Sequence, residues 1–397
     1  MPVPRVKPGK YPAVLSYGFR PFFLLGSLYA GLSILFWLPL FYGHRETASL
    51  FAPVDWHIHE MLFGYLGAII TGFLLTAIPN WTGRLPVQGM SLFVLIMLWL
   101  PGRFAVFFSA DIGWVAAAVI DCAFLTAVAV AAGVEITAGR NWRNLKVLAP
   151  VAVLLVANVL FHIEAHQDGI SDMSRRLGIG AVMMLIMIIG GRIIPSFTRN
   201  WLARENPGRL PVPFNRFDAV TITISALALA AWAFAPETLI AGFALLIAGG
   251  INLVRLARWA GDRTLRDPLV LILHVAYAFV PAGFLLAGIA IFAPGTVPPV
   301  AAIHAFGAGA MGAMTLAVMA RATLGHTGRD LGAGSGTCMV FAAITLSALL
   351  RIAEPFTAST ALLHASAALW ALAFLGYAVL YGQALVTPRL RPRAGVA

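Results

Sequence analysis

Long apolar stretches follow one another along almost the whole of this sequence, and they constrain its fold more than any other feature. A helix needs about 20 apolar residues to cross the hydrocarbon of a bilayer. We predict twelve spans of roughly that length. They lie near residues 21–42, 59–79, 89–108, 113–133, 145–163, 177–195, 217–235, 239–259, 268–292, 299–321, 338–353 and 361–385. The predicted fold class is therefore an all-α polytopic membrane protein.

Composition excludes a water-soluble alternative. Charged residues make up 11% of the chain and hydrophobic ones 60%, against roughly 25% and 45–50% in a soluble domain. The net charge of +11 does not indicate nucleic acid as a partner, because the basic residues lie in short loops between apolar stretches. Cys122 and Cys338 are the two cysteines, too few for a disulfide framework or a CxxC metal motif.

The distribution of basic residues predicts the orientation. If alternate loops and both termini face one side, nearly all Lys and Arg residues fall there. The opposite side keeps Arg45, Arg103, Arg175, Arg176 and Arg351. The positive-inside rule then places both termini in the cytoplasm. The location that we expect is the inner membrane of a bacterium, with the lipid bilayer as a partner.

A polar, basic and proline-bearing segment near the middle predicts the domain organisation. We expect a basic cytoplasmic N-terminus over 1–20 without a cleavable signal peptide. Helices 1–6 would occupy 21–195, a cytoplasmic linker 196–216, helices 7–12 would occupy 217–385, and a basic cytoplasmic tail 386–397.

Two histidines open the second span. His57 and His59 follow Trp56 at the predicted outer end. Residues at i and i+2 point to different sides of a helix, so the two imidazoles could serve two sites. In an extended chain both could bind one metal. The alternative is a polar cap at the membrane interface.

Another pair lies near the end of the fifth span. Asn158, His162 and His166 are four residues apart and share one helical face. Neutral imidazoles at i and i+4 can chelate zinc, copper or iron. A solvated helix end is the alternative, because three polar residues follow closely.

Two further histidines lie inside predicted spans. His304 and His274 both have apolar neighbours, and an ionisable group inside the membrane indicates function. The alternative is a core histidine bonded to a backbone carbonyl. The segment Gly307–Gly312 matches G-x-G-x-x-G only formally, since no strand precedes it. Its small residues would let a helix or a flat cofactor approach closely.

An internal match connects two of these histidines. His59 precedes Thr82-Gly83-Arg84 by the spacing at which His304 precedes Thr327-Gly328-Arg329. Glycines coincide at the same offset, Gly64 with Gly309 and Gly67 with Gly312. If the match is not chance, two imidazoles lie at similar depth on helices that run the same way. Such a pair could bind one metal from both sides, as axial ligands bind haem iron.

Arginines at the predicted cytoplasmic span ends are the last candidates. Arg20, Arg192 and Arg321 could bind haem propionates or another anion bidentately. The alternative is that they only anchor the topology.

These same segments resemble the NnrS family of bacterial membrane proteins. The stretches that carry the resemblance are Gly18–Phe23, Trp56–Gly64, Pro79–Gly83, Gly190–Asn200, Leu273–Tyr277, His304–Gly312 and Leu324–Arg329. The resemblance implies haem and copper as cofactors. It also implies a role in nitric oxide metabolism and tolerance to nitrosative stress, alongside denitrification.

We therefore expect a haem b and copper protein that binds or processes nitric oxide or iron-nitrosyl species, with an unidentified electron donor. Haem would be held by imidazoles among His59, His304 and His274, and copper by His57, His162 and His166. Oxidoreductase turnover is left open. The rival from another class is a secondary transporter without cofactor, which twelve spans favour, and a third option is a cofactor-free sensor or assembly factor.

Overall fold

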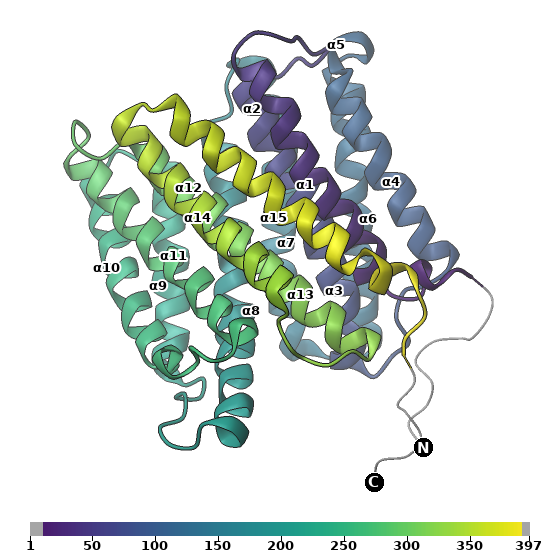
Figure 1. Cartoon of the computed structure of the whole chain (residues 1–397). Coiled ribbons are helices and arrows are strands. Elements are labelled where there is room, and N and C mark those ends of the chain that lie inside the picture. The colour runs from purple at the N-terminus through teal and green to yellow at the C-terminus, as the bar shows by residue number, and fades with distance from the viewer. Residues whose placement is uncertain (1–10, 391–397) are drawn as a thin grey trace. The chain divides into compact units, whose positions relative to one another are not determined.

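Every regular element in the described part of the chain, residues 11–390 of this computed structural model, is a helix (Figure 1). The all-α prediction is confirmed, and twelve helices within that range are long and apolar enough to cross a membrane. In chain order the elements are η1 (Ala13–Leu15), α1 (Phe19–Phe41), α2 (Pro53–His59), η2 (Glu60–Tyr65), α3 (Leu66–Thr82), α4 (Met90–Phe107), α5 (Ser109–Ile112), α6 (Trp114–Ala138), η3 (Trp142–Val147), α7 (Leu148–Gln167), α8 (Met173–Glu205), α9 (Arg216–Phe234), α10 (Leu239–Ala257), η4 (Gly261–Arg263), α11 (Pro268–Phe292), α12 (Pro299–His304), η5 (Ala305–Gly312), α13 (Ala313–Thr327), α14 (Ser335–Thr357) and α15 (Thr360–Val386).

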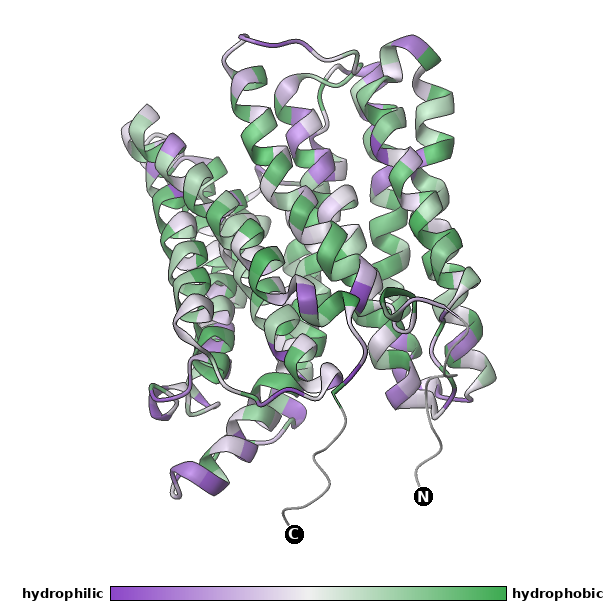
Figure 2. Ribbon diagram, turned by 45° about the vertical axis from the view of Figure 1, so that its right-hand side comes forward, coloured by the Kyte–Doolittle hydropathy of each residue, from purple (hydrophilic) through white to green (hydrophobic). Residues whose placement is uncertain are grey.

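Apolar side chains cover the outside of the spans as well as their inner faces. Figure 2 shows hydrophobic residues along the helices and hydrophilic ones concentrated near their ends and in the connections. Ile240 and Val379 are 77% and 82% exposed. Lipid supplies the contact that such side chains need, so this is a multi-pass membrane protein.

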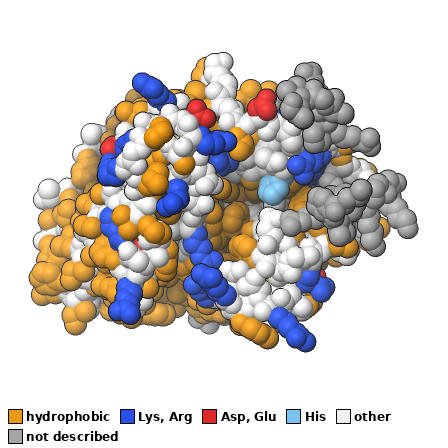
Figure 3. Space-filling model, turned by 90° about the horizontal axis from the view of Figure 1, so that it is seen from below, with side chains coloured by type: hydrophobic (Ala, Val, Ile, Leu, Met, Phe, Trp, Pro, Cys, Tyr) orange, Lys and Arg blue, Asp and Glu red, His pale blue; other side chains and the backbone are white. Residues whose placement is uncertain are grey.

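Basic side chains gather near helix ends and in connections. Figure 3 shows Lys and Arg side chains spread over the face seen from below. In the connections and short turns of the described chain, Arg84 and Arg209 are exposed and Arg263 is half-buried. This distribution is of the kind that positive-inside topology produces, while the cytoplasmic placement of the termini stays a prediction.

The chain forms two compact units. Unit 1 comprises residues 1–175, 319–331 and 374–397, and unit 2 comprises residues 176–318 and 332–373. The predicted division at 196–216 stays a prediction, but α8 does not end at Pro195 and runs on to Glu205. Proline is tolerated inside membrane helices because neighbouring groups satisfy the backbone that it frees.

Within unit 1, glycines let helices α1 and α3 approach closely. A Cβ atom on Gly72 would lie 2.9 Å from the ring of Phe23, and one on Gly18 would lie 2.5 Å from Leu75 Cβ. Small residues at helix contacts are the usual means of packing in membranes, where burial from water does not drive association.

The internal sequence match extends to the backbone. In unit 1, α2 ends at His59 and continues as the π-helix η2; in unit 2, α12 ends at His304 and continues as the π-helix η5. The helices that follow, α3 and α13, end at the matched threonines. Gly83 and Gly328 come next, with φ of +72° and +74°. π-Helical turns are rare and occur often at functional sites. The match therefore indicates that both histidines are candidate functional residues.

Candidate metal centre

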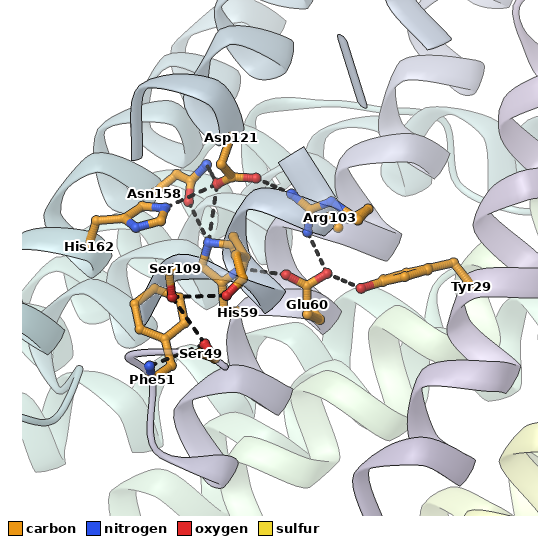
Figure 4. Close-up of polar contacts among 12 residues, drawn as sticks. Tyr29, Ser49, Phe51, His59, Glu60, Arg103, Ser109, Asp121, Asn158 and His162 are labelled. Atoms are coloured by element: carbon orange, nitrogen blue, oxygen red, sulfur yellow. Dashed lines mark hydrogen bonds and ion pairs between the residues drawn. The ribbon is translucent and has the colours of Figure 1, made fainter. Parts of the chain in front are cut away.

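Seven polar side chains from five spans form one cluster inside unit 1 (Figure 4). They are Tyr29 on α1, His59 and Glu60 at the junction of α2 and η2, Arg103 on α4, Asp121 on α6, and Asn158 and His162 on α7. Apart from Tyr29, each is at most 7% exposed. His59 is six residues beyond Pro53, or roughly 9 Å along its span at 1.5 Å per residue. The cluster is therefore buried within the apolar part of the helices.

Two imidazoles and a carboxylate form the centre of the cluster. His59, Asp121 and His162 each offer a ligand atom, and these atoms lie within 4.8 Å of one another. Asp121 Oδ2 is 3.2 Å from His59 Nε2 and 3.2 Å from His162 Nε2. Two histidines and a carboxylate are a ligand set for zinc, copper or iron.

Glu60 orients His59 from the other side. Its Oε1 is 2.9 Å from His59 Nδ1, while its Oε2 accepts from Arg103 Nη1 at 2.5 Å and from the Tyr29 hydroxyl. Arg103 also donates to Asp121 Oδ1. A histidine that donates one ring nitrogen to a carboxylate presents the other as a ligand. Glu60 thus leaves His59 Nε2 directed at Asp121.

Acceptor atoms converge around that nitrogen. His59 Nε2 is 3.0 Å from Asn158 Oδ1 and 3.2 Å from Asp121 Oδ2. The amide orientation follows from Asn158 Nδ2, which donates to Asp121 Oδ2 at 2.8 Å. With His59 neutral and Nδ1 protonated, the lone pair of His59 Nε2 faces these two acceptor oxygens. A cation at this point would relieve their repulsion.

The charge count leads to the same conclusion. Glu60 and Asp121 are both buried carboxylates, and Arg103 is the cation that contacts them. With neutral imidazoles, the cluster carries one negative charge in excess. A buried charge without a partner is costly in a membrane, so the site favours a positive ion.

Two glycines make room for this network. A Cβ atom on Gly64 would lie 2.6 Å from Arg103 Nη1 and 2.8 Å from Glu60 Oε2. One on Gly102 would lie 3.1 Å from Asp121 Oδ1. The Gly64 carbonyl, within the π-helix, accepts from Trp99 Nε1 at 2.9 Å. Larger residues at either position would displace the charged groups.

Phenylalanine rings pack around the imidazoles. The ring centroids of Phe51, Phe63 and Phe161 lie 5.1, 5.1 and 5.2 Å from that of His59. The His162 ring is 5.1 Å away. This close shell suits a single ion better than a flat porphyrin. Haem ligation by His59 stays a prediction.

His57 and His166 lie outside the group of three ligands. His57 stacks on Trp37 with a centroid distance of 4.3 Å, and His166 stacks on Trp114 at 4.6 Å. Because α2 is helical from Pro53, His57 and His59 point to different sides. On α7, Asn158 and His162 face the cluster, whereas His166 is one turn farther along.

The remaining predicted ligands, His274 and His304, belong to unit 2. His274 Nε2 is 2.8 Å from Thr198 Oγ1, and a Cβ atom on Gly261 would lie 2.6 Å from its Nδ1. His304 is half-buried. In the described part of unit 2, a Cβ atom on Gly307 would meet nothing within 4 Å, so the backbone near His304 can be approached closely.

Arg20 is engaged with the protein itself. It is 3% exposed, and its Nη1 donates to the carbonyls of Ala384, Leu385 and Thr387 at 3.2, 2.9 and 2.6 Å. This guanidinium therefore caps the C-terminal end of α15. Arg192 and Arg321 are half-buried on α8 and α13.

Unit 2 has a buried polar network of its own. Arg255 is fully buried and donates through Nε to Asp218 Oδ1 at 2.9 Å and through Nη1 to the Tyr277 hydroxyl at 2.9 Å. The Tyr277 hydroxyl donates to Asn252 Oδ1 at 2.8 Å, and Asn252 Nδ2 donates to Ser225 Oγ at 2.9 Å. Each of these acceptors faces a donor.

Sequence reasoning missed Glu60, Arg103 and Asp121 as site residues. Their signal was present, since a charged residue in an otherwise apolar span is costly and marks function. Asp121 in particular lies inside the predicted span 113–133, away from both ends.

A protein-family model matches this chain. The family model described as NnrS protein matches residues 13–389, nearly the whole chain. No curated protein matches the chain.

Proposed function

The chain belongs to the NnrS family, and on that premise we propose that it holds copper at His59, Asp121 and His162 and binds or processes nitric oxide or an iron-nitrosyl species. The observation that carries the proposal is the convergence of His59 Nε2, Asp121 Oδ2 and Asn158 Oδ1, with His162 Nε2 beside them. A bound cation would relieve the repulsion among these acceptors, and copper is proposed among the metals that suit them because the resemblance to the NnrS family implies it.

The chain's own residues would divide the work. His59, Asp121 and His162 would bind the ion, and Glu60 would orient His59 through Nδ1. Phe51, Phe63 and Phe161 would exclude water. When bound, copper would supply a redox-active centre for a diatomic ligand. Nitric oxide is small and uncharged, so it could diffuse through an apolar shell.

Haem b is proposed for unit 2 at His304. Its imidazole is half-buried, and Gly307, three residues along the same helix, leaves the backbone open to close approach. His304 also occupies the position in the internal match that His59 occupies in unit 1. His274 is less suited, because its Nε2 faces Thr198 and Gly261 packs against its ring.

The proposed setting is the inner membrane of a bacterium under nitrosative stress, alongside denitrification. Turnover would need an electron donor. The test of this role in cells is the growth of a deletion strain in the presence of nitric oxide. The strain is complemented with the wild-type gene or with a gene that encodes His162→Ala.

The decisive experiment is metal analysis with optical spectra of the purified full-length chain, reduced and oxidised, with and without nitric oxide. We expect stoichiometric copper and iron and a Soret band that shifts with nitric oxide. His162→Ala should lose copper, while His166→Ala, one turn along the same helix, should keep it. A colourless and metal-free wild-type protein from haem-replete cells would contradict the proposal and favour a transporter.

A further inference from the structure

The connection between α1 and α2 places an aromatic ring over the candidate metal centre. Residues 42–50 are all exposed or half-buried, but Phe51 is only 7% exposed. Its ring centroid lies 5.1 Å from that of His59 and 5.2 Å from that of His162. Figure 4 shows Phe51 beside both imidazoles. One residue of an exposed connection thus contacts both nitrogen ligands.

Phe51 differs from the other two rings in what holds it. Phe63 is part of η2 and Phe161 of α7, so hydrogen-bonded helices fix both. Phe51 lies outside any helix, in the segment 43–52, which we call the strap. A ring on a connection can move without unwinding a helix.

A few hydrogen bonds fasten the strap to the start of α5. Leu50 N donates to Ser109 Oγ at 2.8 Å, and Ala110 N donates to the Ala48 carbonyl at 2.7 Å. Ser109 Oγ in turn donates to the Val106 carbonyl at 3.0 Å. Because these bonds lie within the strap and at its contact with α5, the strap can detach while the metal ligands stay in place.

We propose that Phe51 controls which ligands reach the metal centre. The inference rests on the proposed copper site. With the strap closed, His59 is 0% and His162 2% exposed. A small uncharged ligand needs only side-chain motion to pass an apolar ring. A larger or hydrated ligand must displace the strap, and an ion must also shed its water against an aromatic surface. Phe51 therefore selects for size and lack of charge.

The test measures how fast a water-soluble chelator, EDTA, removes copper from the copper-loaded full-length protein in detergent. We expect Phe51→Ala to accelerate removal about tenfold or more, because no aromatic ring then has to be displaced before EDTA reaches the copper. Ser109→Ala, which loses one anchor of the strap, should accelerate it by a smaller factor. Leu50→Ala is the matched control, since Leu50 belongs to the same strap but its side chain is 50% exposed, and its rate should stay within about twofold.

Equal acceleration by Phe51→Ala and Leu50→Ala would mean general loosening of the strap and would overturn the inference. So would an unchanged rate in Phe51→Ala with normal copper content. If Phe51→Ala does not accumulate, Phe51→Leu and Ser109→Ala carry the test, and unchanged rates in both would overturn it. A wild-type protein that binds no copper would instead overturn the proposed function itself.

Discussion

The two compact units both bury charged side chains inside membrane spans, but they balance them differently. In unit 1, the carboxylates of Glu60 and Asp121 share the guanidinium of Arg103, and acceptor atoms face one another around His59 Nε2. In unit 2, Arg255 pairs with Asp218, and the hydroxyl of Tyr277 continues a chain in which donors meet acceptors.

The difference separates a structural network from a candidate binding site. A satisfied network can rigidify a membrane protein without any ligand. A network with surplus negative charge and converging acceptors is incomplete without a cation. Excess charge, more than the presence of polar residues, therefore distinguishes the cluster of unit 1.

The largest expected effect is the loss of copper when the surplus carboxylate is removed. Asp121→Asn deletes the charge that both imidazoles face, so copper affinity should fall at least about 1,000-fold, more than the loss of an outer partner causes. Copper content and competition titration measure it. Asp218→Asn, the equivalent change in unit 2, should leave copper unchanged, and copper loss there would break the comparison.

The next largest effect is on the free energy of unfolding, and the residue that is changed lies in unit 2. Asp218→Asn leaves Arg255 buried without its carboxylate, which should cost about 3–5 kcal/mol of unfolding free energy. Thermal melting of the detergent-solubilised protein measures it, with Asp262→Asn, an exposed partner of Arg209, as the control. A melting temperature equal to that of the control would show that the pair in unit 2 is not structural.

A smaller effect is expected from the outer partner of His59. Glu60→Gln keeps the size of the side chain but removes the charge that binds His59 Nδ1 and Arg103, so copper affinity should fall about 10–100-fold. Competition titration and the copper spectrum measure it. Glu164→Gln alters a carboxylate that accepts from Ser174, away from the centre, and should leave both readouts unchanged.

The smallest effect comes from paired hydroxyl deletions. Tyr277→Phe removes one hydrogen bond of the unit 2 network and should cost about 1 kcal/mol of stability with copper unchanged. Tyr29→Phe removes a hydrogen bond to Glu60 and should weaken copper binding less than tenfold, within the range of an outer partner. If Tyr277→Phe weakened copper binding and Tyr29→Phe lowered only stability, the ion would belong to the network of unit 2.

Much of the fold follows from apolar length, whereas the site depends on which spans are neighbours. Twelve spans were predictable because crossing a bilayer sets helix length. His59 and His162 were named from sequence, but their meeting across Asp121 requires α2, α6 and α7 to pack together. Periodicity describes one helix at a time, so it could not reveal that meeting.

Local spacing also leaves out the tertiary contacts of each side chain. His162 and His166 have chelating spacing, yet His166 stacks on Trp114, because α6 begins beside the end of α7. His57 likewise finds Trp37 on α1. In both cases the imidazole stacks on an aromatic ring of a neighbouring helix, which no spacing rule within one helix includes.

Because a π-helix follows His59, the direction in which its imidazole points depends on the number of residues in that segment. A π-turn holds one residue more than an α-turn, and each residue of an α-helix advances the direction of a side chain by about 100°. Deleting a single residue from Glu60–Tyr65 would let the helix become regular and would swing His59 away from Asp121, with every ligand still present in the chain. In this segment insertions and deletions are therefore expected to be tolerated less than substitutions, and the same holds for Ala305–Gly312 after His304.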